Sequence, residues 1–436
     1  MNRNNNKNIE KGVLMINGVS CDKLAKACGT PLFIYDETLI DMKLQEYQTY
    51  FKSDLFNTEI IYASKAFSCK ALLYLVKDHG LSVDVVSGGE LYSAFQAGIS
   101  MDKVYFHGNN KAAEELKMAL SYGCKTIVLD NLMECEMLID MAEKQKKEIH
   151  VIIRINPGIS AHTHKYIVTG DPNSKFGVSI ENDKTILKMI QMVSKSEYVS
   201  FDGFHCHIGS QIFDLTTYET VIEGMIILIK KLKDIHKIDT RLLNLGGGFG
   251  VQYTEEYASK TIKEICNIII TKCESELIKR NMSLEKILIE PGRTIIAEAG
   301  NTLYSVGFLK KTYSKSYLFV DGGMTDNIRV ALYSAKYQCD LANKMDQKKD
   351  KKYTVAGKCC ESGDILIEDV LLPEAESKDL LVVYGTGAYG YSMASNYNKI
   401  RKPAVVFVKD GKARIVIRGE NYSDLMRYET NEEVFI

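Results

Sequence analysis

The feature that most constrains this 436-residue sequence is a regular alternation of short apolar and amphipathic segments between about residues 59 and 290. Apolar residues recur at helical spacing in the longer intervals. Eight strands alternating with helices predict an α/β protein whose first domain is a (β/α)8 barrel. The competing open, doubly wound sheet would usually be shorter and would carry its phosphate-binding turn after the first strand. The predicted strands are 59–64, 81–86, 103–106, 126–129, 149–155, 199–206, 242–245 and 286–290.

After residue 300 the pattern changes, and the predicted strands follow one another without helical segments between them. The clearest are 304–309, 316–320, 365–367, 380–384 and 404–408. We therefore predict a second, mainly antiparallel β-domain, because a chain of this length suits two domains. The expected division is a disordered tail at 1–10, the barrel at 36–298, and a β-domain made of 11–35 plus 299–436. The charged segment 343–352 is expected to be a solvated loop.

Composition excludes several classes of protein. A formal net charge of −1 gives no support for a nucleic acid or an anionic membrane as partner. No apolar run reaches the roughly 18 residues that a membrane span needs. The polar N-terminal segment has no apolar signal core, so we expect no export. Eleven cysteines, an odd number without a C-x-x-C pair, predict reduced thiols in the cytoplasm.

Polar residues follow nearly every predicted barrel strand, at the end where such barrels carry their chemistry. Lys65 follows the first strand, and a desolvated lysine can react there as a neutral amine and form a Schiff base. Glycines 246–248 follow the seventh strand and Arg293 the eighth, the usual seat of a phosphate group. Taken singly, Lys65 could be a surface lysine and the glycines tight-turn residues. Together they predict pyridoxal phosphate, with Glu290 paired to its ring nitrogen.

Two histidines, His205 and His207, lie two positions apart on the sixth predicted strand and so face the same side. Such a pair could bind a metal, as in barrel metallohydrolases. However, the last histidine of the chain is His236, on a predicted helix, so no later strand adds an imidazole ligand. We therefore predict no metal, one imidazole packed on the cofactor ring, and a structural role for the other.

Six motifs in this order resemble the diaminopimelate decarboxylases, which are fold-type III pyridoxal-phosphate decarboxylases with an alanine-racemase-like barrel and a β-domain. The resemblance covers nearly all of residues 12–430. It implies decarboxylation of meso-2,6-diaminopimelate to L-lysine and carbon dioxide by way of a quinonoid, the last step of lysine biosynthesis. It also implies a homodimer in which the Cys360–Glu361 loop of one subunit completes the active site of the other. The motifs are YASKA at 62–66, HGNNK at 107–111, HCHIGS at 205–210, EPGR at 290–293, CESGD at 360–364 and GAY at 387–389.

The same resemblance assigns roles to individual residues. Lys65 would hold the cofactor, His207 would pack on it, Glu290 would meet its ring nitrogen and Cys360 would be the proton donor; these four are the predicted catalytic residues. Segments 162–165 and 174–178 resemble a mobile loop that closes the site. The predicted cofactor-binding residues are Lys65, Asp84, His207, Ser210, Gly246, Gly247, Gly248, Glu290, Pro291, Gly292, Arg293 and Tyr389. The predicted substrate-binding residues are Arg293, Arg329, Tyr333, Glu361 and Tyr389.

Three alternative functions remain open at this point. A related decarboxylase acting on ornithine, arginine, lysine or a secondary-metabolite intermediate would share almost every cofactor residue. Glu361, with Arg329 and Tyr333, favours diaminopimelate, because the ornithine enzymes usually carry aspartate after the cysteine. A non-catalytic pyridoxal-phosphate-binding barrel would lack the β-domain, and a metal-dependent hydrolase would not bind pyridoxal phosphate.

Overall fold

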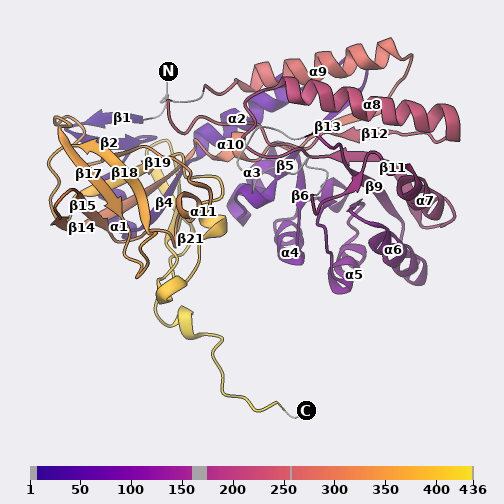
Figure 1. Ribbon diagram of the computed structural model, residues 1–436. Helices are drawn as coiled ribbons and strands as arrows, with labels where there is room; N and C mark the ends of the chain where they lie inside the picture. The colour runs from indigo at the N-terminus through magenta and orange to yellow at the C-terminus, as the bar shows by residue number, and fades with distance from the viewer. Residues whose placement is uncertain (1–6, 160–173, 256–257, 435–436) are drawn as a thin grey trace. The chain divides into compact units, whose positions relative to one another are not determined.

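The computed structural model describes residues 7–159, 174–255 and 258–434 (Figure 1). The chain divides into two compact units. The barrel unit comprises residues 41–252 and 256–295, and the β-unit comprises residues 1–40, 253–255 and 296–436. Each unit is considered by itself below.

The barrel unit contains eight parallel strands that close into a ring. Their order is β5-β6-β7-β8-β9-β11-β12-β13, and β13 pairs back with β5. This confirms the predicted (β/α)8 barrel and all eight predicted strands. The strands are β5 (Asn57–Ala63), β6 (Ser82–Val85), β7 (Val104–Phe106), β8 (Thr126–Leu129), β9 (Ile149–Asn156), β11 (Val199–Cys206), β12 (Leu242–Asn244) and β13 (Lys286–Ile289). A short strand, β10 (Val178–Ser179), adds to the edge of β9.

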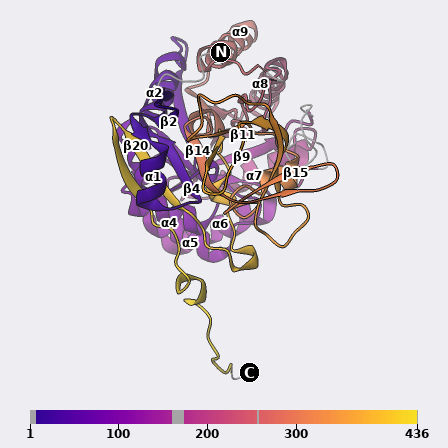
Figure 2. The same ribbon diagram turned by 90° about the vertical axis from the view of Figure 1, so that its left-hand side faces the viewer.

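The barrel helices follow the strands in alternation, and α8 and α9 lie side by side (Figures 1 and 2). Several begin where the sequence supplies a side chain that accepts a hydrogen bond from a free backbone N–H, as Ser87, Asn131 and Thr261 do for α4, α6 and α9. The helices are α2 (Glu37–Tyr50), α3 (Lys70–Asp78), α4 (Gly88–Gln96), α5 (Ala113–Tyr122), α6 (Leu132–Gln145), α7 (Asp183–Val193), α8 (Thr216–His236), α9 (Ile262–Lys279) and α10 (Arg293–Ile296); short 3-10 turns are η1 (Ser64–Ala66) and η2 (Met101–Lys103).

The inside of the barrel is filled by side chains, so it is a core and not a pore. Six strands each contribute one residue to a buried apolar cluster. Because successive side chains of a strand point to opposite faces, their neighbours along each strand pack outward. A filled interior leaves the carboxyl ends of the strands as the place where polar side chains can gather. The cluster consists of Ile61, Tyr105, Val128, Ile152, Leu242 and Leu288.

The β-unit is built around β14 (Gly300–Lys311), which pairs antiparallel with β15, β19 and β4. The main sheet has the order β18-β17-β15-β14-β4-β20-β21. Two pairs, β15–β17 and β4–β20, are parallel, so the sheet is mixed rather than purely antiparallel. Parallel neighbours need long connections, which the intervening chain supplies. The other strands are β4 (Leu32–Asp36), β15 (Ser316–Val320), β16 (Cys339–Leu341), β17 (Lys351–Ala356), β18 (Ile365–Leu372), β19 (Leu380–Tyr384), β20 (Ala404–Lys409) and β21 (Lys412–Ile417).

The beginning of the described chain is a hairpin and not part of a disordered tail. Strand β1 (Lys7–Glu10) pairs with β2 (Val13–Ile16), which also pairs with β3 (Val19–Ser20). Lys11 and Gly12 both have positive φ, 51° and 78°, as a tight two-residue hairpin turn requires. Residues 1–6 of the predicted tail lie outside the described residues.

Two further segments of the β-unit differ from the sequence-based expectation. Helix α1 (Cys21–Cys28) lies in a region where only strands were expected, and it buries Cys21 and Leu24. Strand β17 begins at Lys351, inside the segment expected to be a loop, because Tyr353 and Val355 alternate inward just after the lysines. Short helical turns are α11 (Arg329–Tyr333), η3 (Tyr391–Met393), η4 (Tyr397–Lys399) and η5 (Asp424–Met426). None of the helices in the described segments is long and apolar enough to cross a membrane.

Candidate active site

Lys65 lies in a tight turn at the carboxyl end of the first barrel strand. Strand β5 ends at Ala63, and η1 carries Lys65 between two buried residues, Ser64 and Ala66. Ala63 N–H donates to the Pro291 carbonyl at 3.1 Å, which ties this turn to the loop after β13. Gly292 allows this close approach of the two segments, because a Cβ at position 292 would lie 2.8 Å from the Cβ of Ala63. Lys65 is therefore half-buried on a fixed backbone at the barrel mouth.

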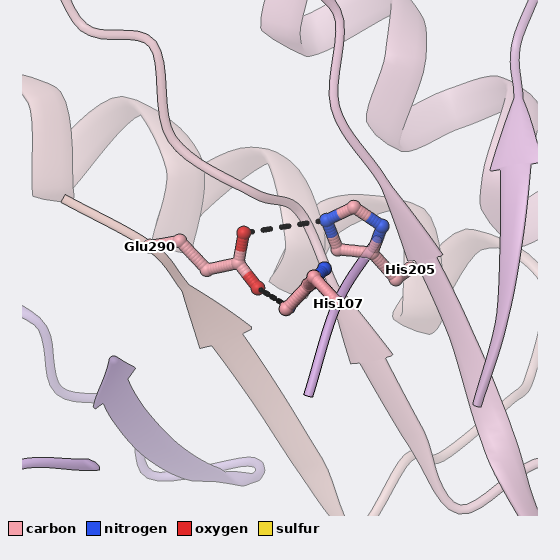
Figure 3. Close-up of side chains that lie close together, drawn as sticks. All are labelled: His107, His205 and Glu290. Atoms are coloured by element: carbon pink, nitrogen blue, oxygen red, sulfur yellow. Dashed lines mark ion pairs between the residues drawn. The ribbon is translucent and has the colours of Figure 1, made fainter. Parts of the chain in front are cut away.

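Glu290 follows β13 and lies among donors from three other strands. Its Oε1 is 2.8 Å from His107 Nε2 and 2.7 Å from Asn244 Nδ2, and its Oε2 is 3.3 Å from His205 Nε2. Figure 3 shows both histidines directed at the carboxylate, one at each oxygen. The two imidazole rings meet edge to face, with centroids 4.7 Å apart. All four side chains are buried.

These donors decide the ionisation of Glu290. Burial alone would raise the pKa of this carboxyl, but His107 and His205 outweigh it and hold the pKa well below its ordinary value. Burial lowers the pKa of His205 to about 3, against the opposing effect of Glu290. His205 is therefore neutral at physiological pH. We assign the proton of the neutral ring to Nε2, because this nitrogen faces the carboxylate of Glu290, 3.3 Å from Oε2.

Asp84, at the end of β6, is a second buried carboxyl with the opposite behaviour. Burial raises its pKa to about 7, and Lys65 opposes this while the charge of Glu290 adds to it. Its Oδ1 has no hydrogen-bond partner among residues 7–159, 174–255 and 258–434. A buried carboxyl without donors favours its neutral form.

His207 follows β11 on the same side of the strand as His205. Its Nδ1 accepts a hydrogen bond from Gly247 N–H at 3.3 Å. Burial, with the positive charges of Lys65 and Arg154 in addition, holds the pKa of His207 well below its ordinary value. The imidazole is thus neutral, which suits packing against an aromatic ring.

The three glycines after β12 serve both as turn residues and as places of close backbone approach. Gly246 and Gly248 have positive φ, 66° and 106°. A Cβ on Gly247 would lie 2.0 Å from the Glu290 carbonyl oxygen, and one on Gly248 would lie 2.0 Å from that of Gly209. Ser210 Oγ accepts a hydrogen bond of 2.8 Å from Arg293 Nη2. A glycine loop, a hydroxyl and a guanidinium at the ends of adjacent strands are a donor set suited to phosphate.

Arg154, on β9, is a buried charge for which we predicted no role from the sequence. Burial lowers the pKa of its guanidinium, and the charges of Asp130 and Glu290 oppose this. Its guanidinium carbon lies 4.5 Å from the ring centroid of Phe176, within the predicted mobile loop. The part of that loop at 174–178 leads into β10, whereas residues 162–165 lie outside the described residues.

In the β-unit, Arg329 is 4% exposed and lies among tyrosines. Its Nη1 donates to Tyr337 Oη at 2.7 Å and to Tyr253 Oη at 3.3 Å. Its guanidinium carbon is 5.9 Å from the ring centroids of both Tyr333 and Tyr389. Three predicted substrate residues thus lie together, and Arg329 forms no ion pair with a described carboxylate. A buried guanidinium of this kind is suited to an anionic ligand.

The Cys360–Glu361 loop is exposed, and a buried aspartate, Asp364, holds its backbone by hydrogen bonds. Asp364 is 3% exposed and accepts hydrogen bonds from Met324 N–H at 2.6 Å and Cys359 N–H at 2.8 Å. The side chains of Cys360 and Glu361 are exposed to solvent. The backbone of the loop is therefore fixed while its reactive side chains face outward.

Sequence reasoning missed Asn244, Tyr253 and Tyr337, which complete these two clusters. Asn244 had a usable signal, because it is a polar residue in the otherwise apolar strand β12 and is fully buried. The two tyrosines had none, since aromatic residues in loops are common. The predicted roles of all the other site residues remain predictions at this point.

The donor atoms of His107, His205 and Glu290 lie within 4.8 Å of one another, as metal ligands would. This set differs from the pair considered from sequence, because it includes His107 and leaves out His207. However, Asn244 and the two imidazoles already surround the carboxylate, and within the described residues the buried His205 Nδ1 has no acceptor of the kind that usually orients a metal-bound histidine. The arrangement is that of a buried carboxylate surrounded by side-chain nitrogen atoms.

Comparison with known proteins places the chain among enzymes. The family described as pyridoxal-dependent decarboxylase, pyridoxal binding domain, matches residues 38–297, more than half of the chain. The diaminopimelate decarboxylase of Bacillus subtilis (strain 168) is 45% identical over 421 residues, which is 96% of each chain. That of Staphylococcus aureus (strain COL) is 43% identical over 423 residues, 97% of this chain and 98% of the relative. Among solved structures, diaminopimelate decarboxylase from M. jannaschii in co-complex with L-lysine has a TM-score of 0.92 at 31% identity and 99% coverage of both chains.

Proposed function

This chain belongs to the diaminopimelate decarboxylase family of pyridoxal-dependent decarboxylases, and we propose that it converts meso-2,6-diaminopimelate to L-lysine and carbon dioxide. The feature of the molecule that supports this most is the position of Lys65, at the end of the first barrel strand on the same barrel as an ionised Glu290. A metal-dependent hydrolase would need neither a lysine at the position of Lys65 nor this ionised glutamate. A related decarboxylase with another substrate is the second candidate, and only the substrate-facing residues separate the two.

The cofactor of the family is pyridoxal phosphate, and the barrel unit fits it. The glycine loop leaves room that a Cβ would fill, and Ser210 with Arg293 supplies donors for the phosphate. Lys65 would hold the cofactor covalently through Nζ, and the neutral His207 would pack on its ring. When bound, pyridoxal phosphate supplies the electron sink that accepts the electron pair freed as carbon dioxide leaves.

The remaining steps depend on this chain's own groups. Glu290 would keep a proton on the ring nitrogen, which an ionised carboxylate can do and a neutral acid cannot. Cys360 would then deliver a proton to the substrate carbon from which the carboxylate has departed. The proton and the released carbon dioxide together balance the conversion of the diacid to lysine.

Substrate choice would depend on the β-unit. Arg329 is a buried cation that donates to tyrosine hydroxyls and forms no ion pair with a described carboxylate, so the distal carboxylate of diaminopimelate would supply a counter-charge. Glu361 would bind the distal amino group. Ornithine and lysine lack that carboxylate and would leave Arg329 without it, which a site built for hydrogen bonding penalises by about 10⁴-fold.

We further infer a homodimer that works in the cytoplasm. Cys360 and Glu361 are exposed on a fixed loop, as expected if they complete the active site of a second copy. The buried cysteines Cys206, Cys273 and Cys339 are thiols and not disulfides, which suits a reducing compartment.

A substrate panel tests this function. Carbon dioxide release is measured from meso-diaminopimelate, ornithine, arginine and lysine, with purified protein and added pyridoxal phosphate. We expect diaminopimelate to be the preferred substrate and Arg329→Gln to reduce that preference. Faster release from ornithine, arginine or lysine would make the chain a related decarboxylase, and a protein that binds no pyridoxal phosphate would contradict the assignment altogether.

A further inference from the structure

The carboxylate of Glu290 is held by three side chains that the reaction as described does not use. His107 follows β7, His205 lies on β11 and Asn244 ends β12, so each comes from a different strand of the barrel. Asn244 Nδ2 donates a hydrogen bond of 2.7 Å to the carboxylate, and the Nε2 atoms of His107 and His205 lie 2.8 and 3.3 Å from its oxygens. The exposed fractions of these side chains are at most 6%.

The donors are shared unequally between the two oxygens. Oε1 receives both Asn244 Nδ2 and His107 Nε2, and a carboxylate oxygen accepts about two hydrogen bonds. Among the described residues, Oε2 is approached only by His205 Nε2, at the longest of the three distances. One acceptor position on Oε2 therefore remains for another donor, while Oε1 is saturated.

Asn244 is itself fixed, so the arrangement is not a loose contact. Its Oδ1 accepts a hydrogen bond of 2.9 Å from Gly246 N–H, at the start of the glycine loop. That bond sets which end of the amide faces Glu290. The loop proposed to hold the phosphate and the carboxylate proposed to meet the ring are thus connected through one side chain.

Asp84 shows what a buried carboxyl does in the same barrel without such donors. It is 1% exposed, its Oδ1 has no partner in the described part of the chain, and burial raises its pKa. Glu290 is buried to a similar degree, yet its pKa is lowered. The histidines beside Glu290 account for its lowered pKa, and the charge of Glu290 adds to the raised pKa of Asp84.

We propose that His107, His205 and Asn244 form a clamp that keeps Glu290 ionised and oriented, with Oε2 as the oxygen that meets the cofactor's ring nitrogen. This rests on the proposed function, because it assigns the clamp to the ring nitrogen of pyridoxal phosphate. The three clamp residues are positioning residues: they act on Glu290 and through it on the cofactor.

The test compares His107→Phe, which keeps a ring but removes the donor, with His107→Gln, which keeps an N–H donor. His79→Phe is the matched control, because His79 Nε2 lies beside a carboxylate too, 3.3 Å from Asp41 Oδ1, at a less buried site of the same unit. The full-length protein is measured with and without pyridoxal phosphate. The readouts are the infrared band of a protonated carboxyl, the dissociation constant of pyridoxal phosphate and the visible spectrum of the bound cofactor.

We expect His107→Phe to show a protonated carboxyl that is absent from the His107→Phe, Glu290→Gln double variant. We also expect it to weaken cofactor binding by about tenfold or more, since a donor to a charged group is lost. His107→Gln should recover most of the affinity, and His79→Phe should resemble the wild type. If His107→Phe does not fold, His205→Phe against His205→Gln gives the same comparison of a lost and a retained donor at the other oxygen of Glu290.

The clamp is overturned if His107→Phe leaves the infrared spectrum, the affinity and the visible spectrum unchanged. It is also overturned if the cofactor-free protein binds Zn²⁺ one to one through His107 while His107→Phe does not change cofactor affinity, because the cluster is then a metal site. The infrared readout requires no turnover. Failure of the proposed substrate would therefore leave this result intact, and the two can be told apart.

Discussion

The barrel unit and the β-unit carry their functional residues in opposite ways. In the barrel, Glu290 and His205 are buried, and Glu290 meets partners from its own chain. In the β-unit, Cys360 and Glu361 are exposed, although Asp364 beneath them is buried and hydrogen-bonded. With the roles proposed above, the residues that would hold the cofactor ring have their partners within the barrel unit, whereas the proposed proton donor and Glu361 face outward. This difference is what a site shared between two copies would require.

The largest expected effects are those of substitutions at Lys65, the proposed cofactor-binding lysine, and at Cys360, the proposed proton donor. Lys65→Ala should abolish both turnover and the visible absorbance of the bound cofactor, with a loss of about 10⁴-fold or more. Cys360→Ser should lose about 10²–10⁴-fold in turnover, the usual contribution of a general acid, and keep that absorbance. Visible spectra and rates of carbon dioxide release measure both. A Cys360→Ser protein that loses its cofactor would show that this division of roles is wrong.

The next effect concerns the support of the exposed loop. Asp364→Ala leaves the buried N–H groups of Met324 and Cys359 without acceptors, at a cost of about 2–5 kcal/mol in the free energy of unfolding. Turnover should fall while cofactor loading stays normal, because the barrel is untouched. Ser362→Ala, on the same loop but exposed, is the control and should leave stability unchanged. Unfolding curves with a loading measurement check this, and equal effects of both variants would refute it.

A buried acid of the β-unit predicts a pH effect on stability. Burial raises the pKa of Asp326 to about 7, so the folded chain keeps a proton that the unfolded chain releases near pH 4. Between these values the folded state binds more protons, and stability falls as the pH rises, by at most about 4 kcal/mol. Asp326→Asn should remove this part of the decline.

The measurement is the difference in unfolding free energy between wild type and Asp326→Asn at pH 4, 5.5, 7 and 8, the range spanned by the two pKa values. The difference should grow in favour of the variant up to about pH 7 and then level off. Asp239→Asn is the control, because that side chain is 83% exposed. If the difference in unfolding free energy does not change with pH, the pKa of Asp326 is not raised in the folded protein.

The smallest expected effect comes from a comparison of two glycines, Gly247 in the barrel unit and Gly363 in the β-unit. Gly247→Ala places a Cβ 2.0 Å from the Glu290 carbonyl oxygen, so the backbone must shift, at a cost of about 1–3 kcal/mol together with weaker cofactor binding. At Gly363 the nearest atom to a Cβ is Glu361 Oε1, 3.9 Å away, and Gly363→Ala should have little effect. Unfolding and cofactor titrations distinguish them. Equal behaviour would show that the barrel loop tolerates a side chain.

How much the sequence predicted also differs between the two units. The eight barrel strands followed from periodicity, because each is a short apolar run between helices, and their carboxyl ends located Lys65, Glu290 and the glycine loop. The surroundings of Glu290 did not follow, because Asn244, His107 and His205 come from strands far apart in sequence, and only closure of the barrel brings them together.

The β-unit was less predictable. Its parallel pairs join distant segments, and β17 begins in a lysine-rich stretch that resembles a loop until the buried Tyr353 and Val355 are reached. Likewise, the environment of Arg329 depends on Tyr253, a residue that precedes most of the β-unit in sequence. Local patterns do not record such long-range pairings.

Mixing Lys65→Ala chains with Cys360→Ser chains tests the shared active site most directly. Each variant alone should be nearly inactive. If one copy supplies Lys65 and the other supplies Cys360, random pairing makes about half of the dimers mixed, each with one intact site, and restores about a quarter of wild-type turnover. A mixture that forms mixed dimers but stays as inactive as its components would contradict a site completed by two copies.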